Sequence, residues 1–300
     1  MLAWLFGGLV TLLGGGLYAR HWLRTRLAAP RLPVVGTPSS HGLAGRTVEI
    51  PTARGRRLAG WLLAGDATRG TAVICHGWGV NRCYMLPLAR PLQAAGWQVL
   101  VFDARNHGVS DADSFSSMPR FAEDMDAALD WVRAEANATA GPLLAAGHSV
   151  GAAATLLSAS RRRDLAGVIS VSAFVHPEAM MRRWLAAHRI PQRPFGWLVL
   201  RYVEWVIGYR FAAIAPVNRI AHIPCPVLLA HGAADRVIPP ADAEALAAAA
   251  NPATTTLVWL PGGHDLRGAL DAHWPRLRQF LTQLEQDWAA SPPPIGQGTG

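Results

Sequence analysis

The sequence contains no lysine, and charged residues of all types make up only 16% of its 300 residues. Its formal net charge of +8 therefore comes from arginine alone. Proteins that bind nucleic acids cluster their basic residues, commonly with aromatic residues interleaved. Here the longest arginine run is residues 161–163, and neither a zinc-finger nor an RNA-binding signature accompanies it. We therefore expect no nucleic-acid partner.

Cysteine is scarce as well. Three cysteines without close pairs, Cys75, Cys83 and Cys225, argue against a disulfide framework, and no C-x-x-C occurs. His76 and His107 belong to no H-E-x-x-H pattern, so we expect structural hydrogen bonds from them instead of metal ligation. The sequence thus predicts neither a metal nor a cofactor.

Residues 2–19 lack charge altogether. As a helix these 18 residues would span about 27 Å, just short of the roughly 30 Å hydrocarbon core of a bilayer. Trp4 and Tyr18 lie near the two ends, where aromatic side chains favour the membrane interface. Four arginines follow the segment and none precedes it: Arg20, Arg24, Arg26 and Arg31.

The position of these arginines predicts how the segment is used. A cleavable signal peptide carries its positive charge before the apolar run, whereas arginines after a membrane span mark the cytoplasmic side. We therefore expect residues 1–28 to form a single-pass anchor in the cell (inner) membrane, with the rest of the chain in the cytoplasm. Five glycines weaken this helix and keep a cleaved signal as the alternative.

Strands alternate with helices along most of the remaining chain. Prolines and glycines break residues 29–45, which we expect to be a linker to a domain over 46–288, with a disordered tail at 289–300. The expected strands are residues 46–52, 56–64, 70–77, 97–108, 142–147, 166–173, 225–232 and 255–262. The expected helices are residues 83–95, 119–135, 150–160, 241–250 and 268–287. This alternation predicts an α/β fold with a mostly parallel sheet covered by helices on both faces.

Residues 174–223 interrupt the alternation between two expected strands. The segment interleaves arginines with large aromatic residues such as Trp184, Trp197 and Trp205. A connection this long is uncommon unless it forms a functional element. We expect a helical cap over the strand ends; the alternative is an insertion that only covers the sheet.

Residues 143–157 form an apolar run with one polar pair, His148 and Ser149. Gly147 and Gly151 flank the pair and complete the pattern G-x-S-x-G between an expected strand and an expected helix. Such a turn strains the central residue, and the glycines prevent collisions of side chains. The pattern predicts that Ser149 presents its hydroxyl at the carboxyl edge of the sheet, where ligands bind in open parallel sheets.

A serine nucleophile needs a general base, which a carboxylate orients. In this architecture the order along the chain is serine, acid, histidine. Asp235 and His264 follow the last two expected strands, so both can converge on Ser149. Three alternatives stay open: Asp235 and His264 only cap turns or helices, His273 is the base, or Glu178 is the acid.

Acyl transfer also requires donors for the developing oxyanion. One expected donor is the backbone N–H of Val150, directly after the serine. The other is expected from the glycine-containing loop at residues 76–79, with Trp78 as the donor residue.

Together these motifs resemble the α/β-hydrolase family over residues 46–287. The segments "HGWG", "FDARNHGVSD", "GHSVG", "HGAADRVIP" and "GGHDL" occur in the order typical of that family. The resemblance implies a catalytic triad of Ser149, Asp235 and His264, with Trp78 and Val150 at the oxyanion hole. Asn106 stands where the family usually has glycine, which puts the conformation of that loop in doubt. With its N-terminal apolar segment, the chain is most similar to the membrane-anchored, serine-aminopeptidase-like branch.

We therefore expect a serine hydrolase that cleaves carboxylic esters through an acyl-enzyme. Its expected substrate is a small-molecule ester or a lipid-like molecule at the membrane surface. The alternatives are a peptidase or acyltransferase that uses the same triad, or an inactive membrane-bound scaffold. The sequence leaves the oligomeric state open.

Overall fold

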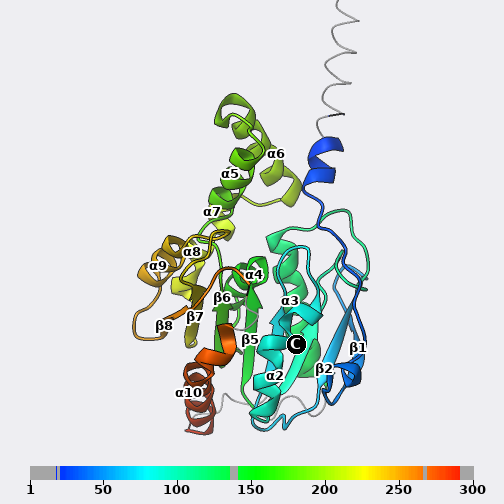
Figure 1. Cartoon of the computed structure of the whole chain (residues 1–300), viewed down its shortest axis with the longest axis vertical. Helices are drawn as coiled ribbons and strands as arrows, with labels where there is room; N and C mark the ends of the chain where they lie inside the picture. The colour runs from blue at the N-terminus through cyan, green and yellow to red at the C-terminus, as the bar shows by residue number, and fades with distance from the viewer. Residues whose placement is uncertain (1–17, 19–20, 136–140, 266–268, 291–300) are drawn as a thin grey trace, which may run out of the picture.

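The computed structural model describes residue 18 and residues 21–135, 141–265 and 269–290. A sheet of eight strands in the order β1-β2-β4-β3-β5-β6-β7-β8 forms its centre (Figure 1). The strands are β1 (Gly45–Pro51), β2 (Arg57–Leu63), β3 (Thr71–Cys75), β4 (Gln98–Phe102), β5 (Leu143–His148), β6 (Gly167–Val171), β7 (Val227–Gly232) and β8 (Thr255–Leu260).

Strands β3 to β8 run parallel, whereas β2 is antiparallel to both β1 and β4. Strands β3, β5 and β7 are buried along their whole length, because helices cover both faces of a parallel sheet. The carboxyl ends of parallel strands meet at one edge. At that edge β5 leads into Ser149, β7 into the loop of Asp235, and β8 into the loop of His264.

Helices form two layers around the sheet. Leu92 of α2 and Leu281 of α10 belong to the core on one face, and Phe121 of α3, Leu156 of α4 and Leu246 of α9 belong to the core on the other. These helices are α2 (Leu86–Ala94), α3 (Met118–Ala134), α4 (Val150–Ala159), α9 (Pro240–Ala249) and α10 (Ala269–Ala290). The arrangement confirms the expected α/β fold with a mostly parallel sheet.

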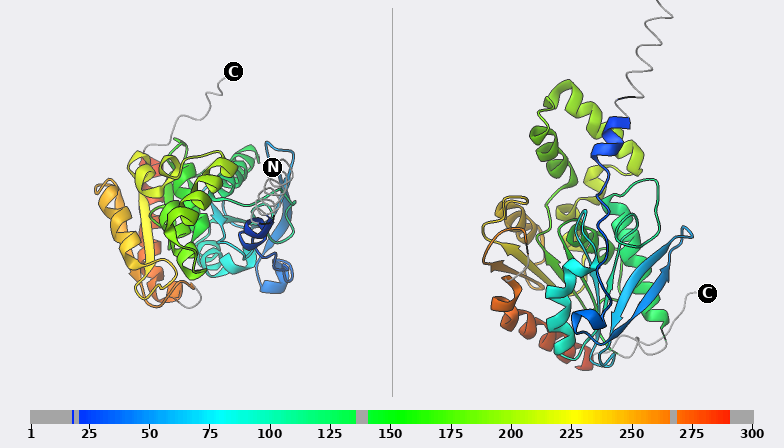
Figure 2. Two further views of the ribbon diagram at one scale, coloured as in Figure 1. Left: turned by 90° about the horizontal axis from the view of Figure 1, so that it is seen from above. Right: turned by 45° about the vertical axis from the view of Figure 1, so that its right-hand side comes forward.

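The chain between β6 and β7 is helical, and α5 and α6 rise above the carboxyl edge of the sheet (Figures 1 and 2). An apolar cluster that includes Leu185 and Phe211 holds this part together. Helical residues 21–26 lie beside it, with the ring of Trp22 6.3 Å from the ring of Trp184. The elements are α5 (Pro177–Ala187), η3 (Gln192–Gly196), α6 (Trp197–Ile207), α7 (Phe211–Ile214), α8 (Pro216–Arg219) and η4 (Ile220–His222).

The strand expected over residues 97–108, with polar loop residues at its end, stops at Phe102. The reason is Asp103, whose buried carboxylate accepts hydrogen bonds from the backbone N–H groups of Arg82 (2.8 Å) and Val109 (3.0 Å). These bonds fold residues 103–109 into a loop at the carboxyl edge.

Residues 29–45, the expected linker, contact the domain. Arg31 donates hydrogen bonds to the carbonyl oxygens of Gly108 and Ser110, and Leu43 is buried in the core. The segment between helical residues 21–26 and β1 therefore packs against the domain.

The structure describes only part of the expected C-terminal tail and of the expected N-terminal anchor. Helix α10 continues to Ala290, two residues into the segment expected as a tail, and residues 291–300 lie outside the described residues. Residues 1–17 and 19–20, most of the expected anchor, also lie outside them. Within the described part of the chain, no helix is both long enough and apolar enough to cross a membrane.

Candidate active site

The turn between β5 and α4 holds Ser149 in a strained backbone conformation. Its φ of 57° and ψ of −121° lie in a region that residues with a side chain rarely adopt. A Cβ on Gly147 would lie 2.5 Å from the carbonyl oxygen of Gly151, and a Cβ on Gly151 would lie 2.3 Å from that of His76. The two glycines are therefore required for the close packing that presents Ser149.

The structure brings the three expected residues of the triad into one chain of hydrogen bonds. The Nε2 atom of His264 lies 3.0 Å from Oγ of Ser149, and its Nδ1 atom lies 2.7 Å from Oδ2 of Asp235. Each contact is within the range for a nucleophile, a base and an orienting acid. The geometry is that of a serine activated by a histidine whose tautomer the carboxylate fixes.

Asp235 is held by its own loop. Its Oδ1 atom accepts hydrogen bonds from the backbone N–H groups of Val237 (2.8 Å) and Ile238 (2.9 Å). Burial opposes ionisation of this carboxyl, but the hydrogen bonds from Ile238, His264 and Val237 outweigh burial and lower its pKa below the ordinary value of 3.8. Asp235 is therefore a fixed anion beside the imidazole.

His148 has a position in the site that the sequence alone does not reveal. Its Nε2 atom donates a hydrogen bond of 2.9 Å to the carbonyl oxygen of His264, and the centroids of the two rings lie 4.8 Å apart. Burial, and then the neighbouring His264, lower the pKa of His148 to about 4. The neutral ring of His148 thus holds the backbone of His264 through a hydrogen bond, next to Ser149.

The loop after β3 passes directly over the serine. A Cβ on Gly77 would lie 3.2 Å from Cβ of Ser149, a tight contact that the absence of a side chain at Gly77 avoids. The ring of Trp78 stacks on Phe121, with centroids 6.1 Å apart. Val150 is the first residue of α4 and directly follows Ser149; the assignment of the Val150 and Trp78 N–H groups to an oxyanion hole stays a prediction.

His76 and His107 use both ring nitrogens in hydrogen bonds that support this loop. His76 donates to the carbonyl oxygen of Gly77 (2.7 Å) and accepts from the backbone N–H of Ala104 (3.0 Å). His107 accepts from the backbone N–H of Gly79 at 3.2 Å, and its Nδ1 atom lies 3.0 Å from the carbonyl oxygen of the second residue before it. Their hydrogen bonds are structural.

Asn106 adopts a left-handed backbone conformation. Its φ is 66°, in the left-handed region that asparagine tolerates better than most residues. Its side chain donates to Oγ of Ser116 (3.1 Å) and accepts from the backbone N–H of Asp113 (2.6 Å). These two bonds stabilise the turn, and asparagine is thus accommodated at this position.

Of the two alternative residues, one lies on α5 and the other has a side chain that the structure does not describe. Glu178 lies on α5, where it pairs with Arg182 at 2.7 Å. His273 lies on α10 among side chains that the structure does not describe. Among the described residues, Asp235 and His264 are the carboxylate and the histidine that form a hydrogen-bonded chain with Ser149.

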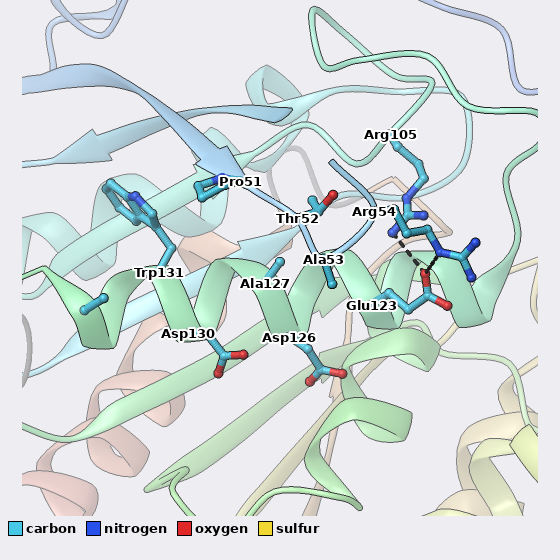
Figure 3. Close-up of a pocket in the computed structure, with 11 residues that line it drawn as sticks. Pro51, Thr52, Ala53, Arg54, Arg105, Glu123, Asp126, Ala127, Asp130 and Trp131 are labelled. Atoms are coloured by element: carbon cyan, nitrogen blue, oxygen red, sulfur yellow. Dashed lines mark hydrogen bonds and ion pairs between the residues drawn. The ribbon is translucent and has the colours of Figure 1, made fainter. Parts of the chain in front are cut away.

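A pocket of about 470 Å³ lies away from these residues, between the turn after β1 and helix α3 (Figure 3). Its acidic groups already have cationic partners: Glu123 pairs with Arg54 and with Arg105, each at 3.1 Å, and Asp130 pairs with Arg162 at 2.7 Å. None of the triad residues lines it.

A mostly parallel sheet that delivers a strained serine to the start of a helix is the architecture of the α/β-hydrolases, and the chain has this fold. Residues 66–210 match the hydrolase family described as serine aminopeptidase, S33. The matched range includes Ser149 and ends before Asp235 and His264.

Individual proteins show the same relationship. An uncharacterised protein of Mycobacterium tuberculosis, MT2364, is 29% identical over 287 residues, which cover 92% of this chain and 93% of the relative. The esterase Pf2001 of Pyrococcus furiosus has a similar fold, with a TM-score of 0.69 and 20% identity over 86% of this chain and 97% of its own. Est1E of Butyrivibrio proteoclasticus, solved with ferulic acid bound, has a TM-score of 0.63 and 18% identity over 79% of this chain and 98% of its own.

Proposed function

We propose that the protein is a serine hydrolase that cleaves carboxylic esters through an acyl-enzyme. The observation that carries the proposal is the continuous hydrogen-bonded chain from Ser149 through His264 to Asp235 at a strained strand–helix turn. A hydroxyl in this environment loses its proton to the imidazole as it attacks a carbonyl carbon, which makes a weak nucleophile effective.

In the proposed reaction, Oγ of Ser149 attacks the ester carbonyl while Nε2 of His264 takes the hydroxyl proton. The backbone N–H groups of Trp78 and Val150 stabilise the resulting oxyanion. His264 then gives its proton to the leaving alkoxide, and the C–O bond of the ester breaks to release the alcohol. A water molecule, deprotonated by His264, hydrolyses the acyl-enzyme, and the proton returns to Ser149.

Both acidic residues in the segment 174–223 are paired with arginines, which favours an ester substrate over a peptide substrate with a free amino terminus. An aminopeptidase needs unpaired carboxylates to bind the substrate's ammonium group. Glu178 pairs with Arg182, and buried Glu204 pairs with Arg201 and Arg210, each at 3.0 Å. Two similar folds, those of Pf2001 and Est1E, belong to a protein named as an esterase and to one that binds ferulic acid.

The test compares hydrolysis of short p-nitrophenyl esters with hydrolysis of aminoacyl p-nitroanilides by the full chain. We expect turnover of the esters, loss of that turnover in Ser149→Ala, and little release of p-nitroaniline. Ester turnover that persists in Ser149→Ala would contradict the assignment of the nucleophile. Faster cleavage of the anilides would instead support the peptidase.

A further inference from the structure

Helix α6 is apolar on two opposite faces. Its inner face packs Leu200, Val203 and Ile207 against a small core with Leu185 and Phe211. A helix that is apolar all round is normally buried on all sides. The outer face of α6 carries Trp197, Leu198, Tyr202 and Trp205.

The outer face is open to solvent. Trp205 is 76% exposed, Trp197 54% and Leu198 52%, and Phe195 directly before α6 is 59% exposed. We call these four residues the α6 patch. Large exposed apolar groups in one short segment mark a surface that binds another apolar phase. Tryptophan in particular favours the boundary between lipid headgroups and acyl chains.

The segment that carries the α6 patch is rich in arginine. Residues 174–223 contain seven arginines and two glutamates, and both glutamates pair with arginines of the same segment. Arg189 and Arg193 are exposed and lie just before the patch in the chain. This combination of exposed aromatic and aliphatic residues with arginine is the chemistry of a surface that binds anionic lipid.

The α6 patch also lies at the same end of the molecule as helical residues 21–26. Figures 1 and 2 show α5 and α6 above the rest of the domain, beside helical residues 21–26. Trp22 contacts Trp184 of α5, and Tyr18 is 69% exposed. The uncharged residues 2–19 precede this point in the sequence, so a membrane that received them would lie next to α6.

We propose that the α6 patch inserts into the headgroup region of an anionic lipid bilayer. The arginines of residues 174–223 hold the surface at the headgroups, and the aromatic side chains enter the upper acyl region. This places the carboxyl edge of the sheet, with Ser149, beneath a helix that contacts lipid. The proposal concerns a surface and holds whether or not the site hydrolyses esters.

The test uses an environment-sensitive fluorophore on single cysteines of the full chain. Cys75 and Cys225 are buried and burial raises the pKa of both thiols, that of Cys225 to about 12, so Cys83→Ser is a sufficient background. The reporter sites are Leu198→Cys and Trp205→Cys. The matched control is Ala94→Cys, an exposed alanine at the end of α2, just before the amino end of β4 and so opposite the carboxyl edge.

Each labelled protein is reconstituted in vesicles of phosphatidylcholine with phosphatidylglycerol, and quenching by brominated lipid is compared with quenching by aqueous iodide. We expect severalfold stronger lipid quenching and weaker iodide quenching at 198 and 205 than at 94. Lipid quenching should decrease in phosphatidylcholine alone, and no decrease would contradict the role of the arginines.

Two results would overturn the proposal. Iodide quenching at 198 and 205 equal to that at 94 would show that the patch stays in water. Protection from iodide without lipid quenching would show that a protein surface, such as a second copy of the chain, covers it.

Discussion

His148 donates a hydrogen bond of 2.9 Å from its ring to the backbone carbonyl of His264, whose own ring contacts Ser149. His264 is thus held at two points. Its ring is hydrogen-bonded to Ser149, and its backbone carbonyl accepts a hydrogen bond from His148, the residue before Ser149. The hydrogen bond from His148 positions the loop that carries the proposed base.

The first prediction concerns this hydrogen bond. We expect His148→Leu, which removes the donor, to lower kcat for ester hydrolysis about 10- to 100-fold with a much smaller change in KM, because a displaced base affects chemistry more than binding. His148→Gln keeps an N–H donor and should recover much of the lost rate. Equal losses in both variants would show that the ring only fills space.

The second prediction concerns Asp235. Asp235→Asn retains the shape of the side chain but removes the charge that orients the imidazole, so we expect kcat to fall by about 10³- to 10⁴-fold. The variant should unfold at a urea concentration close to that of the wild type. A loss of less than about tenfold in a folded variant would assign the acid role to another residue.

The third prediction concerns the close packing under the serine. Gly151→Ala places a Cβ about as close as 2.3 Å to a backbone oxygen, so we expect it to cost about 3 kcal/mol or more of unfolding free energy and to reduce activity. Gly42→Ala is the control, because its φ of 70° disfavours alanine but nothing lies within 4 Å. The control should cost about 1–2 kcal/mol and leave activity unchanged.

The fourth prediction concerns pH and stability. The pKa of buried His148 is lowered from 6.5 to about 4, so the unfolded chain binds a proton that the folded protein does not between these values. The contribution of neutral His148 to the free energy of unfolding is therefore fully present above pH 6.5. It decreases as the pH falls below 6.5 and is lost as the pH falls through 4. Its cause is burial first, and protonation would also place an N–H on Nδ1, which has no hydrogen-bond partner among the described residues.

The measurement is the free energy of urea unfolding at pH 7.5 and at pH 5 for the wild type and His148→Gln. From the lowered pKa we expect the wild type to lose about 2 kcal/mol more than the variant over this interval. Equal losses would show that His148 titrates normally in the folded protein.

Much of the fold could be predicted because buried parallel strands are short apolar runs in sequence. The runs at β3, β5 and β7 are buried throughout, so neither face needs polar residues to interrupt the pattern. The site could be predicted in part because its residues directly follow strand ends. A residue in that position lies at the carboxyl edge whatever the intervening connections do.

Other features depend on contacts between distant segments and leave no local pattern. The supporting role of His148 requires knowing that the backbone of His264, 116 residues away, passes above it. The packing of residues 29–45 depends on hydrogen bonds from Arg31 to carbonyl oxygens that lie 77 and 79 residues later in the chain. The end of β4 is set by the buried pair of Asp103 and Arg82, at 2.6 Å, and not by a turn residue.

The central claim is that Ser149 is a nucleophile activated by His264 and Asp235. Labelling of the folded full chain with a fluorophosphonate, followed by mass spectrometry of its peptides, tests this most directly. We predict a single adduct on Ser149, absent in Ser149→Ala and formed far more slowly in His264→Ala. A folded protein that takes up no label, or takes it up on another serine, would contradict the account.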